Sequence, residues 1–343
     1  MKRHINIPVF IPHLGCPNQC VFCNQKTISG VHEFNPDGLS RIIDEVLSTK
    51  GDDTEAEIAF FGGSFTGIDR TLMVRLLEIA YSYVKDGRVK SIRCSTRPDY
   101  INEDVLDTLE RYGVKVIELG LQSVNEDVLN LTKRGHSFSD EERAVKLIAD
   151  RGFSLVGQMM IGLPGSTVES EIKTADFIIS SGAMGARIYP TVVFCDTELS
   201  EMTKWGIYTP ISLDEAVERS ALVLERFALA GVDVIRIGLC ASENLSSEDT
   251  YFGGPNHSAI GELVINRLYY NRIYNSALNM AIDANTVLTV YVSKGSLSKA
   301  IGQRRKNKDL LIENLGVSDI RFVESDRLVG YEILLENEEK KCT

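Results

Sequence analysis

The sequence predicts an α/β protein built on a mostly parallel sheet. Short runs rich in β-branched and aromatic residues alternate with segments of helical periodicity through the first half of the chain. Such strand–helix units favour parallel strands joined by right-handed crossovers. The pattern contains six units, fewer than the eight of a complete barrel. A partial barrel and an open doubly wound sheet both fit it.

The six units are expected in a regular order. The predicted strands are 5–11, 57–61, 89–95, 116–121, 154–161 and 186–194. The predicted helices are 39–48, 70–85, 103–111, 140–151 and 168–181. Asn102 is typical of a helix N-cap, and Gly113 and Gly152 are typical of residues that end helices.

The alternation changes after residue 192. A long amphipathic helix is expected at 213–230, a strand at 232–237, a polar loop at 240–255 and another helix at 261–281. The tail predicts strand, helix, helix, strand, strand at 286–292, 297–301, 310–315, 320–323 and 328–335. We therefore expect a barrel over 1–235, a helical connecting segment over 236–283 and a small α+β domain over 284–343.

Composition narrows the class of protein. The 343 residues are 43% hydrophobic and 25% charged, as in soluble globular proteins, and the net charge of −11 argues against general nucleic-acid affinity, including DNA. Asn6 and Pro8 interrupt the first apolar run, and no other run reaches membrane-spanning length. The seven cysteines are an odd number, which argues against a disulfide framework. We expect a cytoplasmic protein without membrane contact.

Three cysteines stand close together near the start of the chain, at Cys16, Cys20 and Cys23. They could bind zinc with a fourth ligand such as His13, but structural zinc sites usually have two paired half-sites. They could also be unligated thiols that pack in a core. A [4Fe–4S] cluster held by three thiolates is the third interpretation, and it leaves one iron open to bind and activate a ligand.

The context of the cysteines favours a ligand site. They follow the first predicted strand, so they lie at the carboxyl ends of the strands, where ligands bind in parallel α/β folds. The second predicted strand runs into Gly62 and Gly63 at the same end. Paired glycines expose backbone for close approach by a ligand, although a plain turn would use them equally well.

These motifs together resemble the radical S-adenosylmethionine (SAM) superfamily. The Cx3CxxC pattern carries an aromatic residue, Phe22, before its last cysteine. One branch is especially similar, the radical SAM domain of Elongator catalytic subunits, with a more distant likeness to oxygen-independent coproporphyrinogen oxidases. The likeness covers about residues 5–235 and extends over the ordered stretches 117–123, 133–136, 161–165 and 187–191.

The resemblance implies a partial (β/α)6 barrel and a particular chemistry. Its cofactors would be a [4Fe–4S] cluster and SAM, with an electron donor such as flavodoxin or ferredoxin. The open iron would chelate SAM, and one electron would cleave the sulfonium to a 5′-deoxyadenosyl radical that takes hydrogen from substrate. The protein would supply orientation and exclusion of water.

The resemblance also assigns roles to the cysteine loop and the Gly-Gly turn. Cys16, Cys20 and Cys23 would be the cluster ligands. Phe22 would lie against the adenine of SAM, or would simply pack the loop. The methionine amino group of SAM would meet main-chain carbonyls of Gly62, Gly63 and Ser64.

Further SAM contacts are expected at the ends of later strands. Ser95 and Thr96 hold a position that often carries a polar contact, and Gln122 could reach the ribose. Arg134 would pair with the SAM carboxylate through its planar fork, or would be a solvated surface arginine. Gln158 points to the same mouth, where relatives often have an acidic residue.

Two departures from the Elongator branch limit what carries over. Elongator subunits space their first two cysteines more widely than this chain does, and no Gly-rich acetyl-CoA signature follows residue 240. We therefore expect no acetyltransferase domain here, and acetyl-CoA-dependent carboxymethylation of tRNA does not follow from the resemblance.

The tail concentrates positive charge in an acidic protein. Residues 294–308 contain six basic residues and no acidic one. The surrounding element order resembles a KH domain, whose GXXG loop clamps nucleic-acid backbone, although residues 302–305 read Gly-Gln-Arg-Arg and lack the second glycine. The candidate RNA contacts are Lys299, Arg304, Arg305 and Lys306, and the alternative is a solvated helix end.

His257 follows a Gly-Gly-Pro stretch outside all of these motifs. It could be a substrate-facing acid or base, or it could pack against or cap the helix that follows.

Three functions are consistent with the sequence. The first is a radical SAM enzyme that modifies RNA, either tRNA or rRNA. The second is a radical SAM enzyme that acts on a small molecule or a protein, which the acidic net charge favours. The third is a non-enzymatic iron–sulfur or zinc module that binds RNA.

Overall fold

The computed structural model describes residues 3–11, 15–16, 20–24, 34–51, 53–239 and 249–339. All three cysteines of the cluster motif fall within these ranges, whereas His13 and most of the predicted polar loop at 240–255 lie outside them. No described helix combines the length and apolar character that crossing a lipid bilayer requires.

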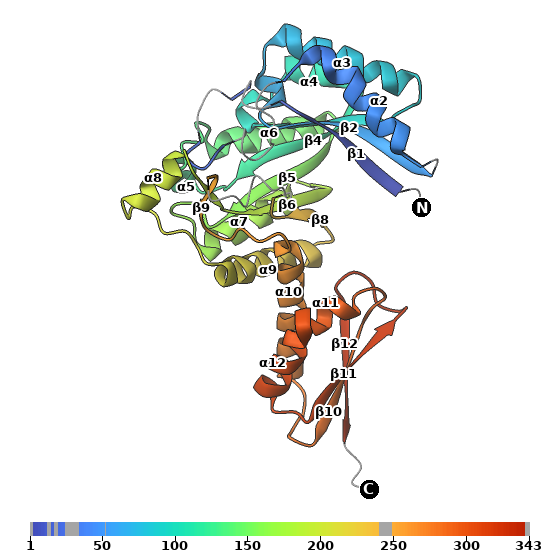
Figure 1. Cartoon of the computed structure of the whole chain (residues 1–343), viewed down its shortest axis with the longest axis vertical. Coiled ribbons are helices and arrows are strands. Elements are labelled where there is room, and N and C mark those ends of the chain that lie inside the picture. Colours follow the sequence, from blue (N-terminus) through green and yellow to red (C-terminus); the bar gives the residue numbers. More distant parts are fainter. Residues whose placement is uncertain are drawn as a thin grey trace.

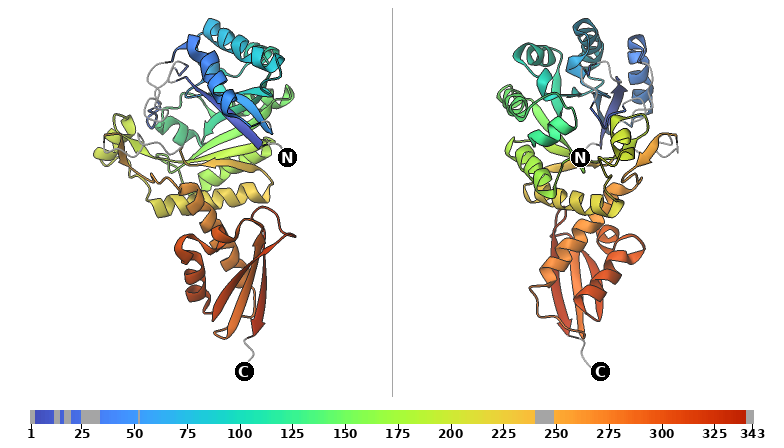
Figure 2. Two further views of the ribbon diagram at one scale, coloured as in Figure 1. Left: turned by 45° about the vertical axis from the view of Figure 1, so that its right-hand side comes forward. Right: turned by 90° about the vertical axis from the view of Figure 1, so that its left-hand side faces the viewer.

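A curved parallel sheet of seven strands forms the larger part of the molecule (Figures 1 and 2). Its strand order is β1-β2-β3-β4-β5-β6-β8, and every neighbouring pair is parallel. The strands are β1 (Arg3–Phe10), β2 (Thr54–Phe61), β3 (Ser91–Thr96), β4 (Val114–Gln122), β5 (Ser154–Ile161), β6 (Gly185–Pro190) and β8 (Asp233–Ile237). This confirms the partial barrel over the doubly wound alternative and adds a seventh strand to the predicted six.

Helices cover the outer, convex face of the sheet (Figure 2). They are α2 (Leu39–Thr49), α3 (Arg70–Lys85), α4 (Glu103–Arg111), α6 (Phe138–Asp150), α7 (Val168–Ser180) and α9 (Leu213–Leu229). Two further short helices are α5 (Glu126–Leu131) and α8 (Glu198–Lys204), and α8 packs on β7 (Val193–Phe194). Short 3-10 turns are η1 (Pro36–Gly38), η2 (Phe65–Gly67) and η3 (Pro98–Tyr100). The Asn102 side chain accepts from the Val105 N–H at 3.0 Å, which confirms the predicted N-cap.

The two faces of each strand differ sharply in polarity. In β4, Leu119 and Leu121 are fully buried in the main apolar core, which forms between the sheet and the outer helices. The alternate residues Glu118, Gly120 and Gln122 face the inside of the half-barrel, because successive side chains of a strand point to opposite faces. The apolar face therefore holds the helices, and the polar face is left for function.

The predicted strand at 186–194 is wrong as a single element. Strand β6 ends at Pro190, and β7 (Val193–Phe194) pairs instead with β9 (Tyr251–Gly253) in a separate antiparallel ribbon. Proline has no N–H to continue a ladder, and the last link to β5 is made by Thr191 N, which donates to Ile161 O at 2.9 Å.

The C-terminal part forms a smaller α+β unit around its own apolar cluster. Its elements are α10 (Ile260–Ala277), β10 (Thr286–Ser293), α11 (Leu297–Ile301), η5 (Gln303–Arg305), α12 (Lys306–Leu315), β11 (Asp319–Ser325) and β12 (Ile333–Glu339). β10 is the central strand, parallel to β11 and antiparallel to β12. The predicted order of elements is confirmed, although the last strand begins at Ile333 rather than at residue 328.

Candidate active site

The Gly-Gly turn and the cysteine loop lie against each other at the carboxyl ends of β1 and β2. Gly62 has φ +98°, a conformation that favours glycine. A Cβ atom on Gly15 would lie 1.9 Å from the carbonyl oxygen of Ser64. Only a glycine at position 15 therefore lets the chain that leads into Cys16 rest on this turn.

Buried hydroxyl groups fasten the turn to the end of β3. Ser64 Oγ and Thr96 Oγ1 are 2.8 Å apart, and Thr66 Oγ1 also contacts Thr96 Oγ1. Ser64 Oγ accepts from the Arg97 N–H at 3.3 Å. The side chains of Ser64 and Thr96 are thus engaged within the protein, which leaves main-chain atoms as the groups that this turn can offer to a ligand.

Two arginines converge on the Cys20 thiol, and both are at most 5% exposed. Nη1 of Arg134 lies 3.3 Å from Cys20 Sγ, and Nη1 of Arg97 lies 3.9 Å from it. Burial raises the pKa of the Cys16 thiol, while the Ser64 N–H and the charges of Arg97 and Arg134 oppose that rise. The net shift of the Cys16 pKa is upward, so the two guanidinium groups only partly offset the effect of burial on this thiol.

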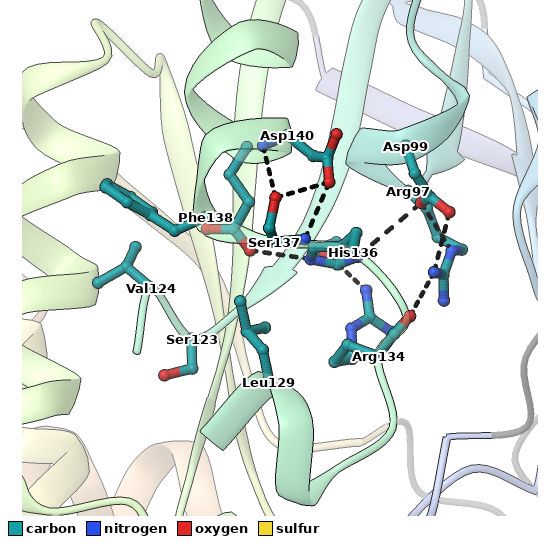
Figure 3. Close-up of polar contacts among 12 residues, drawn as sticks. Arg97, Asp99, Ser123, Val124, Leu129, Arg134, His136, Ser137, Phe138 and Asp140 are labelled. Atoms are coloured by element: carbon teal, nitrogen blue, oxygen red, sulfur yellow. Dashed lines mark hydrogen bonds and ion pairs between the residues drawn. The ribbon is translucent and has the colours of Figure 1, made fainter. Parts of the chain in front are cut away.

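Hydrogen bonds hold both arginines in place and link Arg97 to Arg134 (Figure 3). Arg97 donates to both carboxylate oxygens of Asp99, at 2.9 and 3.0 Å, and also to the carbonyl oxygen of Arg134. Arg134 Nη2 donates to Gly120 O at 2.6 Å, and its Nε is buried without a hydrogen-bond partner among the described residues. The alternative that Arg134 is a solvated surface arginine is therefore wrong.

A buried histidine–glutamate pair lies near these arginines. His136 Nε2 and Glu141 Oε1 are 3.0 Å apart, and both side chains are fully buried. Burial, together with the nearby charges of Arg134 and Arg97, lowers the pKa of His136 to about 3. Burial raises the pKa of Glu141 well above 4.5. Both directions favour a neutral carboxyl group and a neutral imidazole in this pair over an ion pair.

The inner face of the sheet carries a closed network of buried charges below the cysteines. Arg93 joins two carboxylates, with Nε 2.9 Å from Glu57 Oε2 and Nη1 3.1 Å from Glu118 Oε1. Arg187 donates to both oxygens of Glu118, at 2.8 and 3.1 Å. Gln158 Nε2 donates to Glu118 Oε2 at 3.2 Å and to Ser95 Oγ at 3.4 Å, which ties the network to the end of β3.

Three predicted residues have contacts that define their place. Gln122 ends β4 with φ +72°. A Cβ atom on Gly120 would lie 3.0 Å from Gln122 Nε2 and 3.7 Å from Arg134 Nη2, so the Gln122 amide lies near the Arg134 guanidinium group. Phe22 packs on a small cluster that includes Val21 and Leu199, as the loop-packing alternative predicts. His257 is exposed, and its Nδ1 accepts from the N–H of Ala259 at 3.1 Å. Ala259 is the N-cap residue of α10, and no described side chain caps that helix, so His257 lies beside the helix start without capping it.

The basic loop of the C-terminal unit has an unusual backbone. Gly302, Arg304 and Arg305 have φ of +79°, +50° and +65°. Arg305 occupies the position of the second glycine in a GXXG loop, and it adopts the left-handed conformation that glycine favours. Arg304, Arg305 and Lys306 are exposed, Lys299 is half-buried, and none of the four has an ion pair with a described residue.

Comparison with known proteins decides the family. A model of the radical SAM superfamily matches residues 10–178, and a model of a radical SAM C-terminal domain matches residues 183–270. The chain belongs to the radical SAM superfamily. This membership indicates an enzyme, and the superfamily implies a [4Fe–4S] cluster and SAM.

The chain is similar to several individual proteins, one of which is named for an activity on tRNA. It is 28% identical over 244 residues to a tRNA uridine(34) acetyltransferase of Methanocaldococcus infernus, covering 59% of this chain and 46% of the relative. It is 34% identical over 147 residues to Elongator complex protein 3 of Schizosaccharomyces pombe, covering 41% and 27%. An uncharacterized protein of Methanocaldococcus jannaschii is 31% identical over 226 residues, with 62% and 68% covered.

A solved structure agrees on the fold. The archaeal Methanocaldococcus infernus Elp3 with an N-terminal deletion superposes with a TM-score of 0.61 at 22% identity, over 83% of this chain and 67% of that one. The chain spans less than half of the length of both the tRNA uridine(34) acetyltransferase and the yeast Elongator protein.

The donor chemistry of this radical SAM site fits an iron–sulfur cluster. The Cys16 thiol meets the backbone N–H of Ser64 in the Gly62–Gly63 turn and lies near Cys20. The buried guanidinium groups of Arg97 and Arg134 supply positive charge beside Cys20. The described cysteines form no disulfide with one another. Within the described residues no three Cys, His, Asp or Glu side chains stand close enough to hold a metal ion, and residues 17–19 between two of the cysteines are not among them.

Sequence reasoning missed Arg97, Asp99, Glu118 and Arg187. Arg97 directly follows the predicted Ser95-Thr96 strand end, so its position was the available signal. Glu118 and Arg187 are charged residues inside apolar strands, and a buried charge of this kind is rare unless it is paired. These charged residues occupy the strand positions whose side chains alternate toward the inside of the half-barrel, and that alternation was the available signal for the Glu118 network.

Proposed function

We propose that the chain is a radical SAM enzyme that acts on RNA, either a tRNA or an rRNA. A [4Fe–4S] cluster and SAM, when bound, would supply one-electron cleavage of the sulfonium to methionine and a 5′-deoxyadenosyl radical. The observation that carries the first half of the proposal is the convergence of Arg97 and Arg134 on Cys20 beside the Gly62–Gly63 turn. A reductant such as flavodoxin or ferredoxin would provide the electron.

Different residues at the mouth of the half-barrel would bind the cluster and SAM. Cys16, Cys20 and Cys23 would hold the cluster, and main-chain atoms of the Gly62–Gly63 turn would meet the SAM amino group. Arg134 would direct its free Nε toward the SAM carboxylate, since a buried donor without a partner is costly and a carboxylate satisfies it.

Further contacts to SAM would come from the ends of the next strands. Gln122 would bind the ribose of SAM. Ser95 and Gln158 would contact polar groups of SAM. Phe22 would serve the site through the packing of the cysteine loop. The buried network around Glu118 would hold the strand ends in register, because charges paired from three strands fix their relative positions.

The RNA half of the proposal is supported by two separate observations. The relatives at 28% and 34% identity include a protein described as a tRNA uridine(34) acetyltransferase and an Elongator protein. The loop of Arg304, Arg305 and Lys306 exposes positive charge without ion pairs to described residues, and exposed cations of this kind bind phosphates. We assign residues 284–343 as an RNA-binding domain.

The test is anaerobic reconstitution followed by SAM and dithionite, with and without bulk tRNA. We expect 5′-deoxyadenosine, and we expect tRNA to increase its formation. Nucleoside mass spectrometry of total RNA from cells with and without the gene should then show one altered nucleoside. Deoxyadenosine without any RNA change would indicate a small-molecule or protein substrate, and bound metal without deoxyadenosine would indicate a non-enzymatic module.

A further inference from the structure

The inner face of the half-barrel presents one polar or charged residue from each of its seven strands. These residues are His4, Glu57, Arg93, Glu118, Gln158, Arg187 and Arg236. Six of them are joined by hydrogen bonds or ion pairs from β1 to β6. Arg236, on the edge strand β8, is the exception.

The joined part of this row is balanced in charge. Glu57 and Glu118 supply two negative charges, and Arg93 and Arg187 supply two positive charges. Each of these four side chains is at most 9% exposed. A pairing this complete leaves no charge in the row to offset another cation.

Arg236 adds such a cation. It is paired in register with Arg187 across β6 and β8, and residues paired in register in a parallel sheet point to the same face. Arg236 is half-buried, and no described residue forms an ion pair with it. Its charge reaches the phenol of Tyr189, where it opposes the rise in pKa that burial causes.

Tyr189 supplies a second group beside the same face. It lies two residues after Arg187 on β6, and the charge of Arg187 acts on its phenol group. Because burial raises the pKa of Tyr189, its hydroxyl keeps its proton at neutral pH. The Tyr189 hydroxyl group on β6 and the Arg236 guanidinium group on β8, which has no ion pair with a described residue, thus come from two adjacent strands.

We propose that Arg236, with Tyr189, forms a binding subsite for a phosphate of the RNA substrate at the open edge of the half-barrel. The inference rests on the proposed RNA-modifying function and adds the place where the substrate backbone is held. β8 is an edge of the sheet, so an extended strand can reach Arg236 from the side while a base enters between the two edges. Phosphate satisfies a guanidinium with two parallel hydrogen bonds.

The test compares Arg236→Gln with Arg226→Gln. Arg226 lies on α9 and pairs with Asp176 on the outer surface at 2.7 Å. Its replacement by glutamine removes the same charge as Arg236→Gln, but away from the inner face. Binding of bulk tRNA would be measured by fluorescence anisotropy over a range of NaCl concentrations. Deoxyadenosine formation from SAM and dithionite would be measured without RNA, and urea unfolding would check the fold.

We expect Arg236→Gln to weaken tRNA binding about tenfold and to lower the slope of log affinity against log salt by about one. RNA-independent deoxyadenosine formation should stay at the wild-type rate, and Arg236→Lys should restore part of the binding. Arg226→Gln should change neither affinity nor slope. A folded Arg236→Gln protein with wild-type affinity and slope would overturn the subsite alone, whereas wild-type protein that does not bind tRNA would overturn the proposed function as well.

Discussion

The half-barrel and the C-terminal unit use positive charge in opposite ways. In the half-barrel, Arg93, Arg97, Arg134 and Arg187 are buried, and each donates to a named acceptor. In the C-terminal unit, Arg304, Arg305 and Lys306 are exposed and have no ion pair with a described residue.

This difference separates two tasks. A buried and paired guanidinium has one position, so it can orient a cofactor or hold a strand end. An exposed cation contributes little to stability but attracts a polyanion through release of counterions. The first region is built to position a reaction, and the second is built to bind.

Removal of a cluster ligand should have the largest effect. Cys20→Ser should abolish bound iron and sulfide after anaerobic reconstitution, because a hydroxyl is a poor substitute for a thiolate ligand of iron. Iron and sulfide analysis with the visible absorption spectrum would measure it. Cys195→Ser is the control, since Cys195 is a half-buried cysteine outside the motif. Retention of a full cluster by Cys20→Ser would contradict the ligand assignment.

Loss of a buried carboxylate should be the largest effect on stability. Glu118→Gln would leave Arg93 and Arg187 without their shared countercharge, and we expect unfolding to become easier by about 3–5 kcal/mol. Glu201→Gln removes one partner of an exposed pair with Lys204, and it should cost less than about 1 kcal/mol. Urea denaturation of both variants would be compared, and equal losses would show that burial does not distinguish the two pairs.

The basic loop should control the salt dependence of binding and little else. Arg304→Gln/Arg305→Gln should reduce the slope of log affinity for bulk tRNA against log salt by about two. The fold should be unaffected because both side chains are exposed. Arg143→Gln/Lys146→Gln removes two charges from exposed ion pairs on α6 and serves as the control. An unchanged slope would contradict RNA binding by this loop and would support the alternative that it is a solvated helix end.

The His136–Glu141 pair should give an effect that is visible only as a pH dependence of stability. Glu141 has a raised pKa in the folded protein, so its contribution to stability is present below about 4.5 and is lost as pH rises toward the folded value. Glutamine does not ionise, so the Glu141→Gln protein does not lose this stability as pH rises. Its stability relative to wild type should therefore increase between pH 5 and pH 8, by at most about 1.4 kcal/mol per pH unit.

Urea denaturation at several pH values would measure the difference. His136 acts in the opposite direction, because its lowered pKa costs stability as pH falls from 6.5 toward about 3. That contribution is common to both proteins. A relative stability that declines with rising pH would show that Glu141 is ionised in the folded protein.

The sequence predicts local elements well and long-range contacts poorly. The predicted helices 70–85 and 103–111 coincide with α3 and α4, because helical periodicity and an N-cap are written in adjacent residues. The pairing of β7 with β9 joins segments more than fifty residues apart, and no local pattern encodes it. The cysteine and glycine motifs were visible for the same reason as the helices.

The arginine pair illustrates the limit on predicting the site. Arg134 was visible as part of a motif, whereas Arg97 acts through Asp99 and the Arg134 carbonyl. Its role depends on the meeting of β3 with the loop after α5, which is a property of the folded chain. The seventh strand was predicted as a strand, but its place in the sheet beside β6 depends on the same kind of long-range contact.

The most direct test of the central claim is a count of 5′-deoxyadenosine per protein after reconstitution with iron and sulfide, with SAM and dithionite. The claim is that Cys16, Cys20 and Cys23 hold a cluster that cleaves SAM beside Arg97 and Arg134. We expect wild-type protein to form deoxyadenosine in amounts that exceed the reduced cluster, and Cys20→Ser to form none. Wild-type protein that carries a full cluster but forms no deoxyadenosine, or Cys20→Ser that forms as much as wild type, would contradict it.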